Sequence, residues 1–395
     1  MRFIRCGSRF FISDTISPTT KDTAGRKLLS RTVTVEFDHA MSLRRFVVVG
    51  VFVAAMCGVP PAPSARVHAS AEALPARLSD QEFWKLVQDF SEPNGSFRSD
   101  NLVSNERQFQ FVIPELVRTA KPGRAYLGVG PEQNFTYMAA LKPSIAFIID
   151  VRRGNLDLHL LYKALFELSA DRAEFVSLLF SRSRPRGLTA KSTAGEIFQA
   201  YSGVFTDGRL YIETISSIRN KLLTKHRFAL SEEDLNGLEY VFRAFFMFGP
   251  QLKYSPVGLA GGTVQPTYAA LMAATDDRGE ARGFLSSEEA FAFVKGLESR
   301  NLIVPVVGNF AGPKAIRAVG AYLKQKGATV STFYLSNVEE YLRRDGFWQD
   351  FCDNVSMLPT DGTSTLIRSI RSVTDDPADG LRSELGAMAT ISNCR

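Results

Sequence analysis

Two glycines and one aspartate are the residues whose types and spacing best fit ligand chemistry. Gly128 and Gly130 follow a short apolar run, and Asp150 ends a second apolar run twenty residues after Gly130. Glycines let the chain turn sharply and let the backbone come close to a ligand. Free N–H groups at the start of a following helix suit a phosphate or a carboxylate. Because a carboxylate at this spacing can accept hydrogen bonds from two ribose hydroxyls, the pattern predicts a nucleotide-type site.

Three polar residues follow the second glycine, and we expect them to take part in the same site. They are Glu132, Gln133 and Asn134, and Asn134 is also expected to cap the next helix. Gln133 stands where the third glycine of G-x-G-x-x-G would be. A lone G-x-G also occurs as a tight turn in other α/β proteins, so that alternative stays open.

The elements around this site read as strand, glycine turn, helix and strand, which is the βαβ pattern. Apolar runs predict strands at 125–129, 145–149, 302–307, 329–335, 355–358 and 364–370. Four or more helices lie between these strands, one of them at 340–352. This alternation predicts an α/β fold with a doubly wound, mostly parallel, Rossmann-like sheet and a helical insertion.

The chain is expected to divide into segments with different roles. We predict an N-terminal helical cap and connector at 72–123, a core at 124–154 and 285–372, a helical insertion at 155–284, and a tail at 373–395. The tail is expected to be loose unless its last cysteine is tied down. The connector is polar and immediately precedes the glycine loop, so it either folds over the site or forms a solvated loop.

The basic excess of the chain lies in its first 71 residues. These contain ten Lys and Arg against four Asp and Glu, which leaves 37 of each among the other 324 residues. The formal net charge of +6 therefore belongs to the N-terminal segment. The rest of the chain has no overall attraction to nucleic acid or to an anionic membrane, and we expect no nucleic-acid partner.

The segment that begins at Met41 has the features of a secretory signal peptide. Arg44 and Arg45 precede an apolar stretch at 46–59 that is too short to span a bilayer comfortably, and small residues at 69–71 offer a cleavage site. We therefore predict a signal peptide at 41–71 and an exported protein, periplasmic or extracellular, with no stable membrane span after cleavage. Residues 1–40 are then a misassigned extension, and an organelle presequence is the alternative.

Export would leave two cysteines, Cys352 and Cys394, in the protein. An even pair in an oxidising compartment is typical of a disulfide, and a bridge between them would hold the last residues to the body. Two free thiols are the alternative.

Several common mechanisms have no motif in this chain. Beyond the leader the only histidines are His159 and His226, without H-x-x-x-H or C-x-x-C spacing, so we expect no metal site. Neither the G-x-S-x-G motif of α/β-hydrolases nor a phosphate-binding P-loop is present. His159 lies in a leucine-rich helix, which favours a core or surface role over that of ligand or base.

What remains resembles the class I S-adenosylmethionine-dependent methyltransferases. The resemblance rests on the two glycines after a first strand, on Asp150 at the end of the second, and on Ser336 and Asn337 at the end of a later strand. It covers about 125–152 and 302–370, which is less than a third of the chain. It implies S-adenosylmethionine as the cofactor, bound by the glycine loop and Asp150, with a second ligand near Ser336 and Asn337.

The chain departs from that family at two places. Tyr126-Leu127 stands where the family has an acidic residue before the first glycine, and Glu132 is the residue that would substitute for it. Val338-Glu339 stands where the family has aromatic and proline residues, so amino-group methylation is not implied. The catalytic residues are not specified by the resemblance.

Three functions stay open at this point. The protein is a methyltransferase-like enzyme with an unassigned substrate, a non-catalytic envelope or periplasmic protein that binds a small-molecule ligand in the same crevice, or a structural envelope component. The polar residues of the crevice disfavour the third function. A signal peptide directs the protein away from cytosolic S-adenosylmethionine, which is an argument for the second. We favour the enzyme-like fold with an unassigned activity.

Overall fold

The structure is a computed structural model of the whole chain. It describes residues 13–21, 27–34, 73–254, 265–371 and 380–392. The chain divides into one unit up to Val67 and a second from His68 onward. In the first unit, β1 (Ser13–Lys21) and β2 (Lys27–Thr34) pair as an antiparallel hairpin. The signal peptide predicted at 41–71, with its cleavage site, lies outside the described residues.

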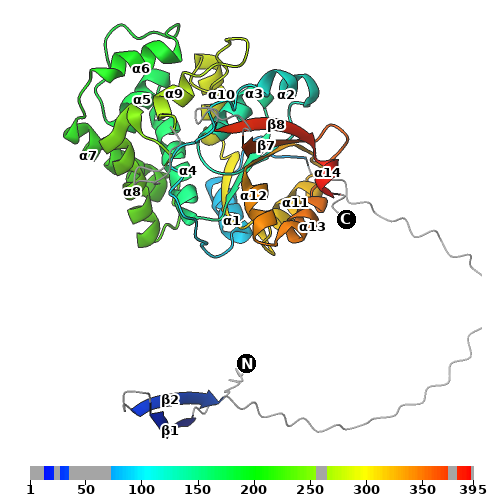
Figure 1. The fold of residues 1–395 in the computed structure, drawn as a ribbon. Helices are drawn as coiled ribbons and strands as arrows, with labels where there is room; N and C mark the ends of the chain where they lie inside the picture. Colours follow the sequence, from blue (N-terminus) through cyan, green and yellow to red (C-terminus); the bar gives the residue numbers. More distant parts are fainter. Residues whose placement is uncertain (1–12, 22–26, 35–72, 255–264, 372–379, 393–395) are drawn as a thin grey trace, which may run out of the picture. The chain divides into compact units, whose positions relative to one another are not determined.

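The second unit, called the body below, is built around a six-stranded sheet with the order β5-β4-β3-β6-β7-β8 (Figure 1). The strands are β3 (Ala125–Gly128), β4 (Ile145–Asp150), β5 (Ile303–Val307), β6 (Val330–Ser336), β7 (Thr365–Arg371) and β8 (Leu381–Ala387). The first five strands in this order are parallel to one another, and β8 is antiparallel to β7. The strand order reverses between β3 and β6. The predicted α/β fold with a mostly parallel sheet is confirmed.

Helices cover both faces of the sheet, which explains why its central strands are wholly apolar. On one face α1 packs against β5 and α11, and α11 packs against β4 and α13. On the other face α3 packs against α2 and α10, and α4 packs against β4, β5 and α10. These helices are α1 (Asp80–Phe90), α2 (Ile113–Thr119), α3 (Gln133–Leu141), α4 (Arg153–Leu168), α10 (Glu288–Ser299), α11 (Ala315–Gln325) and α13 (Trp348–Ser356).

The long segment between β4 and β5 is helical, as predicted. After α4 it forms α5 (Arg172–Phe180), α6 (Ala194–Ser202), α7 (Gly208–Arg219) with a π-helical end at Asn220–Lys225, α8 (Glu232–Phe248) with a 3₁₀ turn at Gly249–Gln251, and α9 (Tyr268–Met272). In Figure 1 the green helices α5 to α8 group to the left of the sheet. Since His68–Arg395 forms one compact unit, the domain boundaries drawn inside it stay a prediction.

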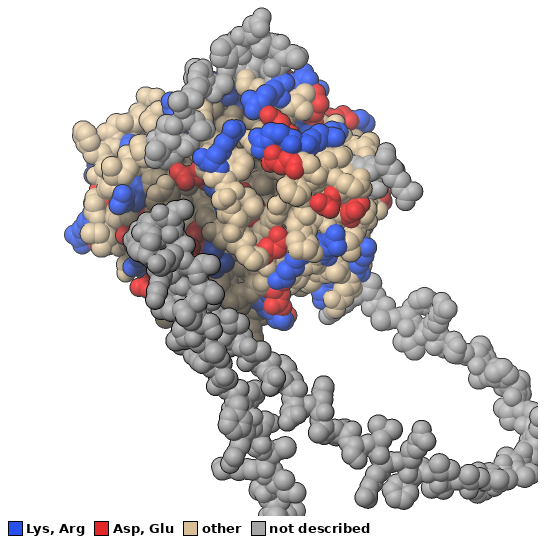
Figure 2. Space-filling view, turned by 60° about the horizontal axis from the view of Figure 1, so that its bottom comes forward, with Lys and Arg blue, Asp and Glu red and all other residues tan. Residues whose placement is uncertain are grey.

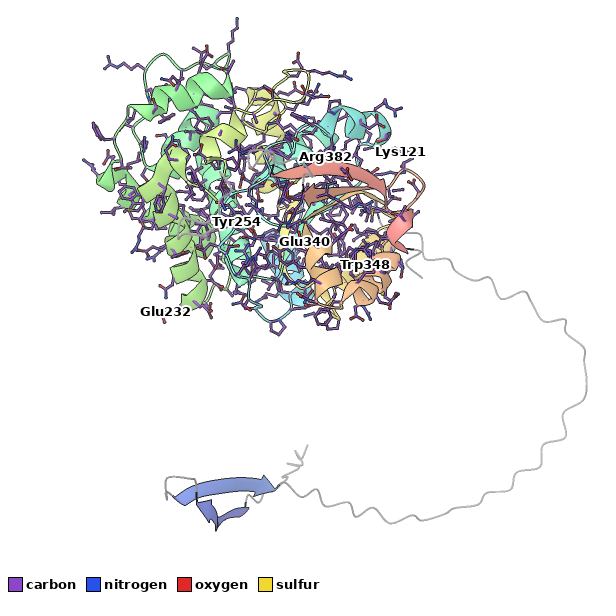
Figure 3. All side chains as sticks on the ribbon, viewed as in Figure 1. Lys121, Glu232, Tyr254, Glu340, Trp348 and Arg382 are labelled. Carbon is purple, nitrogen blue, oxygen red and sulfur yellow. The ribbon has the colours of Figure 1, made fainter. Side chains whose placement is uncertain are left out.

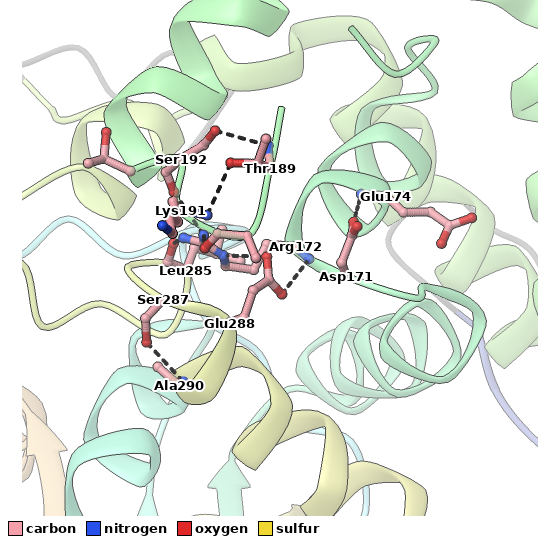
Figure 4. Close-up of polar contacts among 12 residues, drawn as sticks. Asp171, Arg172, Glu174, Thr189, Lys191, Ser192, Leu285, Ser287, Glu288 and Ala290 are labelled. Atoms are coloured by element: carbon pink, nitrogen blue, oxygen red, sulfur yellow. Dashed lines mark hydrogen bonds and ion pairs between the residues drawn. The ribbon is translucent and has the colours of Figure 1, made fainter. Parts of the chain in front are cut away.

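A buried arginine joins the helical insertion to the core. Arg172, at the start of α5, donates from Nε to Glu288 Oε1 (2.8 Å) and from Nη1 to the carbonyl oxygen of Leu285 (2.7 Å). Its Nη2 donates to the carbonyl oxygens of Ala190 (3.1 Å) and Ser192 (2.8 Å). Figure 4 shows this guanidinium between the 182–193 loop and the start of α10. Removing the guanidinium would leave acceptors without their partner, so this contact fixes the insertion to the segment that begins α10.

The C-terminal part of the body differs from the sequence prediction. The single helix predicted at 340–352 is two helices, α12 (Val338–Arg344) and α13, because Gly346 takes φ +81° between them. Residues 355–358, predicted as a strand, end α13 and the turn after it. The tail predicted to be loose contains β8 and α14 (Ala389–Ser392). The described part of the body has six strands, the number predicted, although one of the predicted strands is wrong and β8 was missed.

Cys352 is buried on α13, and α14 packs against that helix. Cys394 lies outside the described residues, so the predicted bridge between the two cysteines stays a prediction.

Within the described residues, no helix combines the length and apolar character that crossing a membrane requires. On the face shown in Figure 2, acidic and basic side chains are interspersed rather than gathered by sign.

Candidate functional site

The body has a cavity of about 560 Å³ at the carboxyl ends of β3, β4, β5 and β6. Such a volume is in the range of small-molecule sites. In an open parallel sheet, ligands bind in the crevice at the point where the strand order reverses, which here is between β3 and β6. The position and the size of the cavity therefore both fit a ligand site.

Five of the residues predicted for the site line this one cavity. They are Gly130, Gln133, Asp150, Ser336 and Asn337. The three segments that carry them therefore lie at the same edge of the sheet, as predicted from the order of the strands. The other three predicted residues, Gly128, Glu132 and Asn134, do not line it.

Asn134 supports the glycine loop from behind. It was expected to cap α3, but that helix begins at Gln133, and Asn134 is fully buried inside its first turn. Its Nδ2 donates to the carbonyl oxygens of Val129 (2.9 Å), Gly130 (3.3 Å) and Pro131 (2.7 Å). The cap prediction is wrong because the amide bonds the loop before the helix instead of the helix N–H groups.

Glycine is required at positions 128 and 130 for different structural reasons. A Cβ at Gly128 would collide with Oδ1 of Asn134, which accepts a hydrogen bond from the Tyr126 hydroxyl (2.8 Å). Gly130 takes φ +74°, and a Cβ there would meet nothing within 4 Å. Gly128 is therefore required by packing, whereas Gly130 is required by its backbone conformation and faces open space.

Glu132 is fully buried and is not part of the cavity wall. Its Oε1 accepts from the Ser104 backbone N–H (3.1 Å), and its Oε2 has no hydrogen-bond partner in the described structure. Burial raises the pKa of this carboxyl to about 7. Glu132 is thus not placed to substitute for the acidic residue that β3 lacks.

Asp150 forms a charged pair at the cavity wall. Its Oδ1 accepts from the backbone N–H of Arg152 (2.9 Å), and its Oδ2 accepts from Nη2 of the same residue (3.3 Å). The Arg152 guanidinium also donates from Nη1 to the carbonyl oxygen of Asp100 in the connector. The pair therefore orients the Asp150 carboxylate and holds the connector over the cavity.

The polar connector folds over the site instead of forming a solvated loop. Residues 96–98, 101 and 104–106 line the cavity. Nη2 of Arg98 donates to the Tyr341 hydroxyl of α12 (3.0 Å), and the Phe97 ring lies edge-on to the Tyr341 ring, 5.2 Å between centroids. Tyr254, labelled near the centre of Figure 3, accepts from the Ser99 hydroxyl (3.2 Å) and also lines the cavity.

Glu106, from the same connector, was not predicted as a site residue. It lines the cavity and is 1% exposed. Its Oε1 accepts from the hydroxyls of Tyr334 (2.7 Å) and Ser336 (2.6 Å), and its Oε2 accepts from Nε2 of Gln133 (3.1 Å) and the hydroxyl of Ser383 (3.4 Å). No local motif marks this residue, because its partners lie 27 to 277 positions away in the chain.

Ser336 and Asn337 form the turn from β6 into α12. Ser336 takes φ +51°, a conformation that is uncommon for a residue with a Cβ and that often occurs at functional sites. Asn337 is the first residue before α12, and its Nδ2 donates to Glu340 Oε2 (3.4 Å). At this turn Ser336, which has the uncommon backbone conformation, and Asn337 both line the cavity.

The comparison with protein families finds one match. The model of a domain of unknown function, DUF7790, matches residues 101–380. The chain belongs to the DUF7790 family. No curated protein matches the chain, and neither comparison names a methyltransferase.

The DUF7790 segment contains most of the cavity wall. It includes the glycine loop, Asp150, Glu106 and the turn at Ser336. It begins after Ser96, Phe97 and Arg98, so these rim residues lie outside the matched segment.

Within the described residues no cluster of three or more His, Cys, Asp or Glu side chains is arranged to hold a metal ion.

Proposed function

We propose that the cavity binds a nucleotide-type small molecule, with methyltransferase-like chemistry on a substrate not yet assigned. One observation carries the proposal: the glycine turn after β3 and the carboxylate at the end of β4 line one cavity at the strand-order reversal. Phosphate- and ribose-containing ligands bind at this place in doubly wound sheets. The resemblance to class I methyltransferases makes S-adenosylmethionine the first cofactor to test.

Three residues that line the cavity have distinct roles in this proposal. Gly130, at φ +74° and with open space beside its Cα, lets the ligand approach the backbone. Asp150 accepts hydrogen bonds from ribose hydroxyls while Arg152 holds its carboxylate in place. Asn337 orients a polar group of the second ligand at the end of β6.

A thermal-shift screen tests the binding directly. The protein without residues 1–71 is mixed with S-adenosylmethionine, S-adenosylhomocysteine, NAD and plain nucleosides. A ligand present at a hundred times its Kd stabilises the folded state by about 2.7 kcal/mol, which is a readily measured shift. A positive ligand is then tested on Asp150→Ala, which is expected to abolish binding of ribose-containing ligands. If none of the four classes shifts the transition, the nucleotide-type assignment is wrong.

The matched control is Asp361→Asn. Asp361 also pairs with an arginine, Arg124 (2.6 Å), but it lies before β7 and does not line the cavity. Its replacement is expected to leave ligand affinity unchanged. If Asp150→Ala unfolds the protein without a separate effect on binding, or if Asp361→Asn weakens binding equally, then Asp150 has only a structural role.

The second candidate is a non-catalytic exported protein that uses the same cavity to bind a small molecule. The predicted signal peptide at 41–71 favours it, because export would remove the protein from the cytosolic cofactor. N-terminal sequencing of the native protein is expected to begin close to Glu72, and an intact Met1 end on cytosolic protein would remove this argument. Incubation with methyl-labelled S-adenosylmethionine and cell-envelope extracts separates the two functions, because only the enzyme transfers the label.

A further inference from the structure

Three carboxylates line the cavity, and they differ in their partners. Asp150 is paired with Arg152, and Asp345 is paired with Arg344 at 2.7 Å. Glu106 is the most buried of the three, yet within the described residues no cationic side chain lies within ion-pair distance of it. A buried carboxylate without a cation is costly unless something compensates its charge.

In every hydrogen bond of the Glu106 carboxylate, the carboxylate is the acceptor. Tyr334, Ser336 and Gln133, which donate to it, line the cavity as well. Each hydroxyl has one proton and gives it to Glu106, so the hydroxyl oxygens can only accept further hydrogen bonds. The amide of Gln133 donates one of its two N–H groups to Glu106, which leaves its oxygen as an acceptor and its second N–H as a donor.

The wall formed by Glu106, Gln133, Tyr334 and Ser336, called the acceptor wall below, therefore presents one negative charge and several acceptors. Ser336 reaches Glu106 from a left-handed conformation (φ +51°), next to an irregularity in the pairing of β6 with β7. A residue with a Cβ holds such a conformation only where its surroundings enforce it. The wall is thus a built feature of the carboxyl edge.

We propose that the acceptor wall binds the primary ammonium group of the small-molecule ligand. An ammonium has three N–H donors and one positive charge, which complement the acceptors and the carboxylate that has hydrogen-bond donors but no cationic partner. This inference rests on the proposed small-molecule function of the same cavity and adds the chemical class of one ligand group. It assigns Glu106 to ligand binding.

The first experiment compares ligands that differ by one amino group. Isothermal titration measures binding of S-adenosylhomocysteine and of its analogue with hydrogen in place of the α-amino group. The wild-type protein is expected to prefer the amino compound by about tenfold or more. Glu106→Gln keeps the side-chain shape but removes the charge, and it is expected to bring the two affinities together. An unchanged ratio in folded Glu106→Gln protein would overturn the inference.

Two further variants separate binding from folding. Ser336→Ala removes one acceptor and keeps Glu106, so a smaller loss of preference is expected. Glu339→Gln is the control, because Glu339 lies beside the cavity without lining it and has its own cation, Arg368 (3.6 Å). It is expected to leave the preference unchanged. Circular dichroism and thermal melting establish that each variant is folded before it is titrated.

A second set of probes does not depend on the nucleotide proposal. Putrescine, spermidine and L-methionine are titrated into wild-type and Glu106→Gln protein. Amine binding that Glu106→Gln abolishes supports the inference even if no nucleoside binds. If nucleosides bind and the amino group does not change their affinity, the inference is wrong and the proposed function is unaffected. If neither class binds the wild-type protein at millimolar concentration, both proposals fail.

Discussion

Nε2 of His159 lies 2.9 Å from the carbonyl oxygen of Gly130, so α4 is tied directly to the glycine loop. Burial lowers the pKa of this imidazole to about 4, because a charged ring loses its hydration there. The ring is therefore neutral at pH 7. Since a carbonyl oxygen can only accept, Nε2 must hold the proton and donate it. The ring is buried, which agrees with the core role that the sequence favoured, and its hydrogen bond to the loop was not predicted.

The first prediction concerns the pH dependence of stability. The folded-state pKa of His159 lies below the unfolded value of about 6.5, so the unfolded chain binds more protons between pH 6.5 and 4. The stability from burying the neutral ring is fully present above about pH 6.5 and is lost as the pH falls towards 4. His159→Gln keeps an N–H donor but does not titrate. Denaturant unfolding should show the wild type losing up to about 1.4 kcal/mol more per pH unit than the variant in this window. If the unfolding free energies of the wild type and of His159→Gln change with pH in parallel, the lowered pKa of His159 is contradicted.

The second prediction concerns the glycine before the loop. Gly128→Ala should destabilise the protein by roughly 2–4 kcal/mol, because the new methyl group collides with the buried Asn134 side chain. Gly154→Ala is the matched control, since a Cβ at Gly154 in α4 meets nothing within 4 Å. The control should be neutral or slightly stabilising, because alanine has the higher helix propensity. Equal unfolding midpoints for the two variants would show that the loop adjusts to the methyl group.

The third prediction concerns two neighbouring acids in the helical insertion. Burial, and then the charge of Asp234, raise the pKa of Asp157 to about 8. The folded pKa lies above the unfolded value of about 3.9, so the stability of the protonated form is fully present below about pH 3.9 and is lost as the pH rises through 8. Asp157→Asn should therefore gain stability relative to the wild type between pH 5 and pH 8, on the order of 1–3 kcal/mol.

Asp234→Asn is expected to change the stability in the opposite direction to Asp157→Asn. Asp234 pairs with Arg153 and belongs to the capping box of α8 with Ser231. Its replacement should destabilise the protein at both pH values by about 1–3 kcal/mol, because a partly buried guanidinium loses its partner. Unfolding experiments at pH 5 and pH 8 measure both variants. Destabilisation by Asp157→Asn at pH 8 would mean that the carboxylate is ionised and satisfied there.

The fourth prediction is the Cys352–Cys394 disulfide in exported protein. Closing a loop of about forty residues should stabilise the fold by roughly 3–4 kcal/mol in the chain-entropy model, and less if the bridge is strained. The contact of α14 with α13 favours the bridge, because α14 ends two residues before Cys394 in the sequence and packs against the helix that carries Cys352. Non-reducing peptide mapping measures it. Two alkylatable thiols in unreduced protein would refute the prediction.

Elements whose signals lie within a few residues were predicted closely from the sequence. Ser79 and Glu82 form the capping box that starts α1 (Asp80–Phe90), which lies in the N-terminal segment expected to be helical. The apolar runs gave β4 and β5 to within a residue, since a strand buried on both faces must be apolar throughout. A strand that is defined mainly by its pairing with a neighbouring strand was not predicted. β8 is only partly buried, and its pairing with β7 identifies it as a strand.

For the candidate site, the sequence by itself determined which segments meet at the cavity. Glycines after one strand and a carboxylate after the next must meet at one edge of a parallel sheet, because the carboxyl ends of parallel strands point the same way. Only the tertiary structure decided which side chains face the cavity. Glu106 joins the wall, and Glu132 turns into the core, although both are acidic residues near the loop. Their directions depend on hydrogen-bond partners and burial contributed by distant parts of the chain, such as Ser383 and Tyr334 for Glu106, which no local spacing encodes.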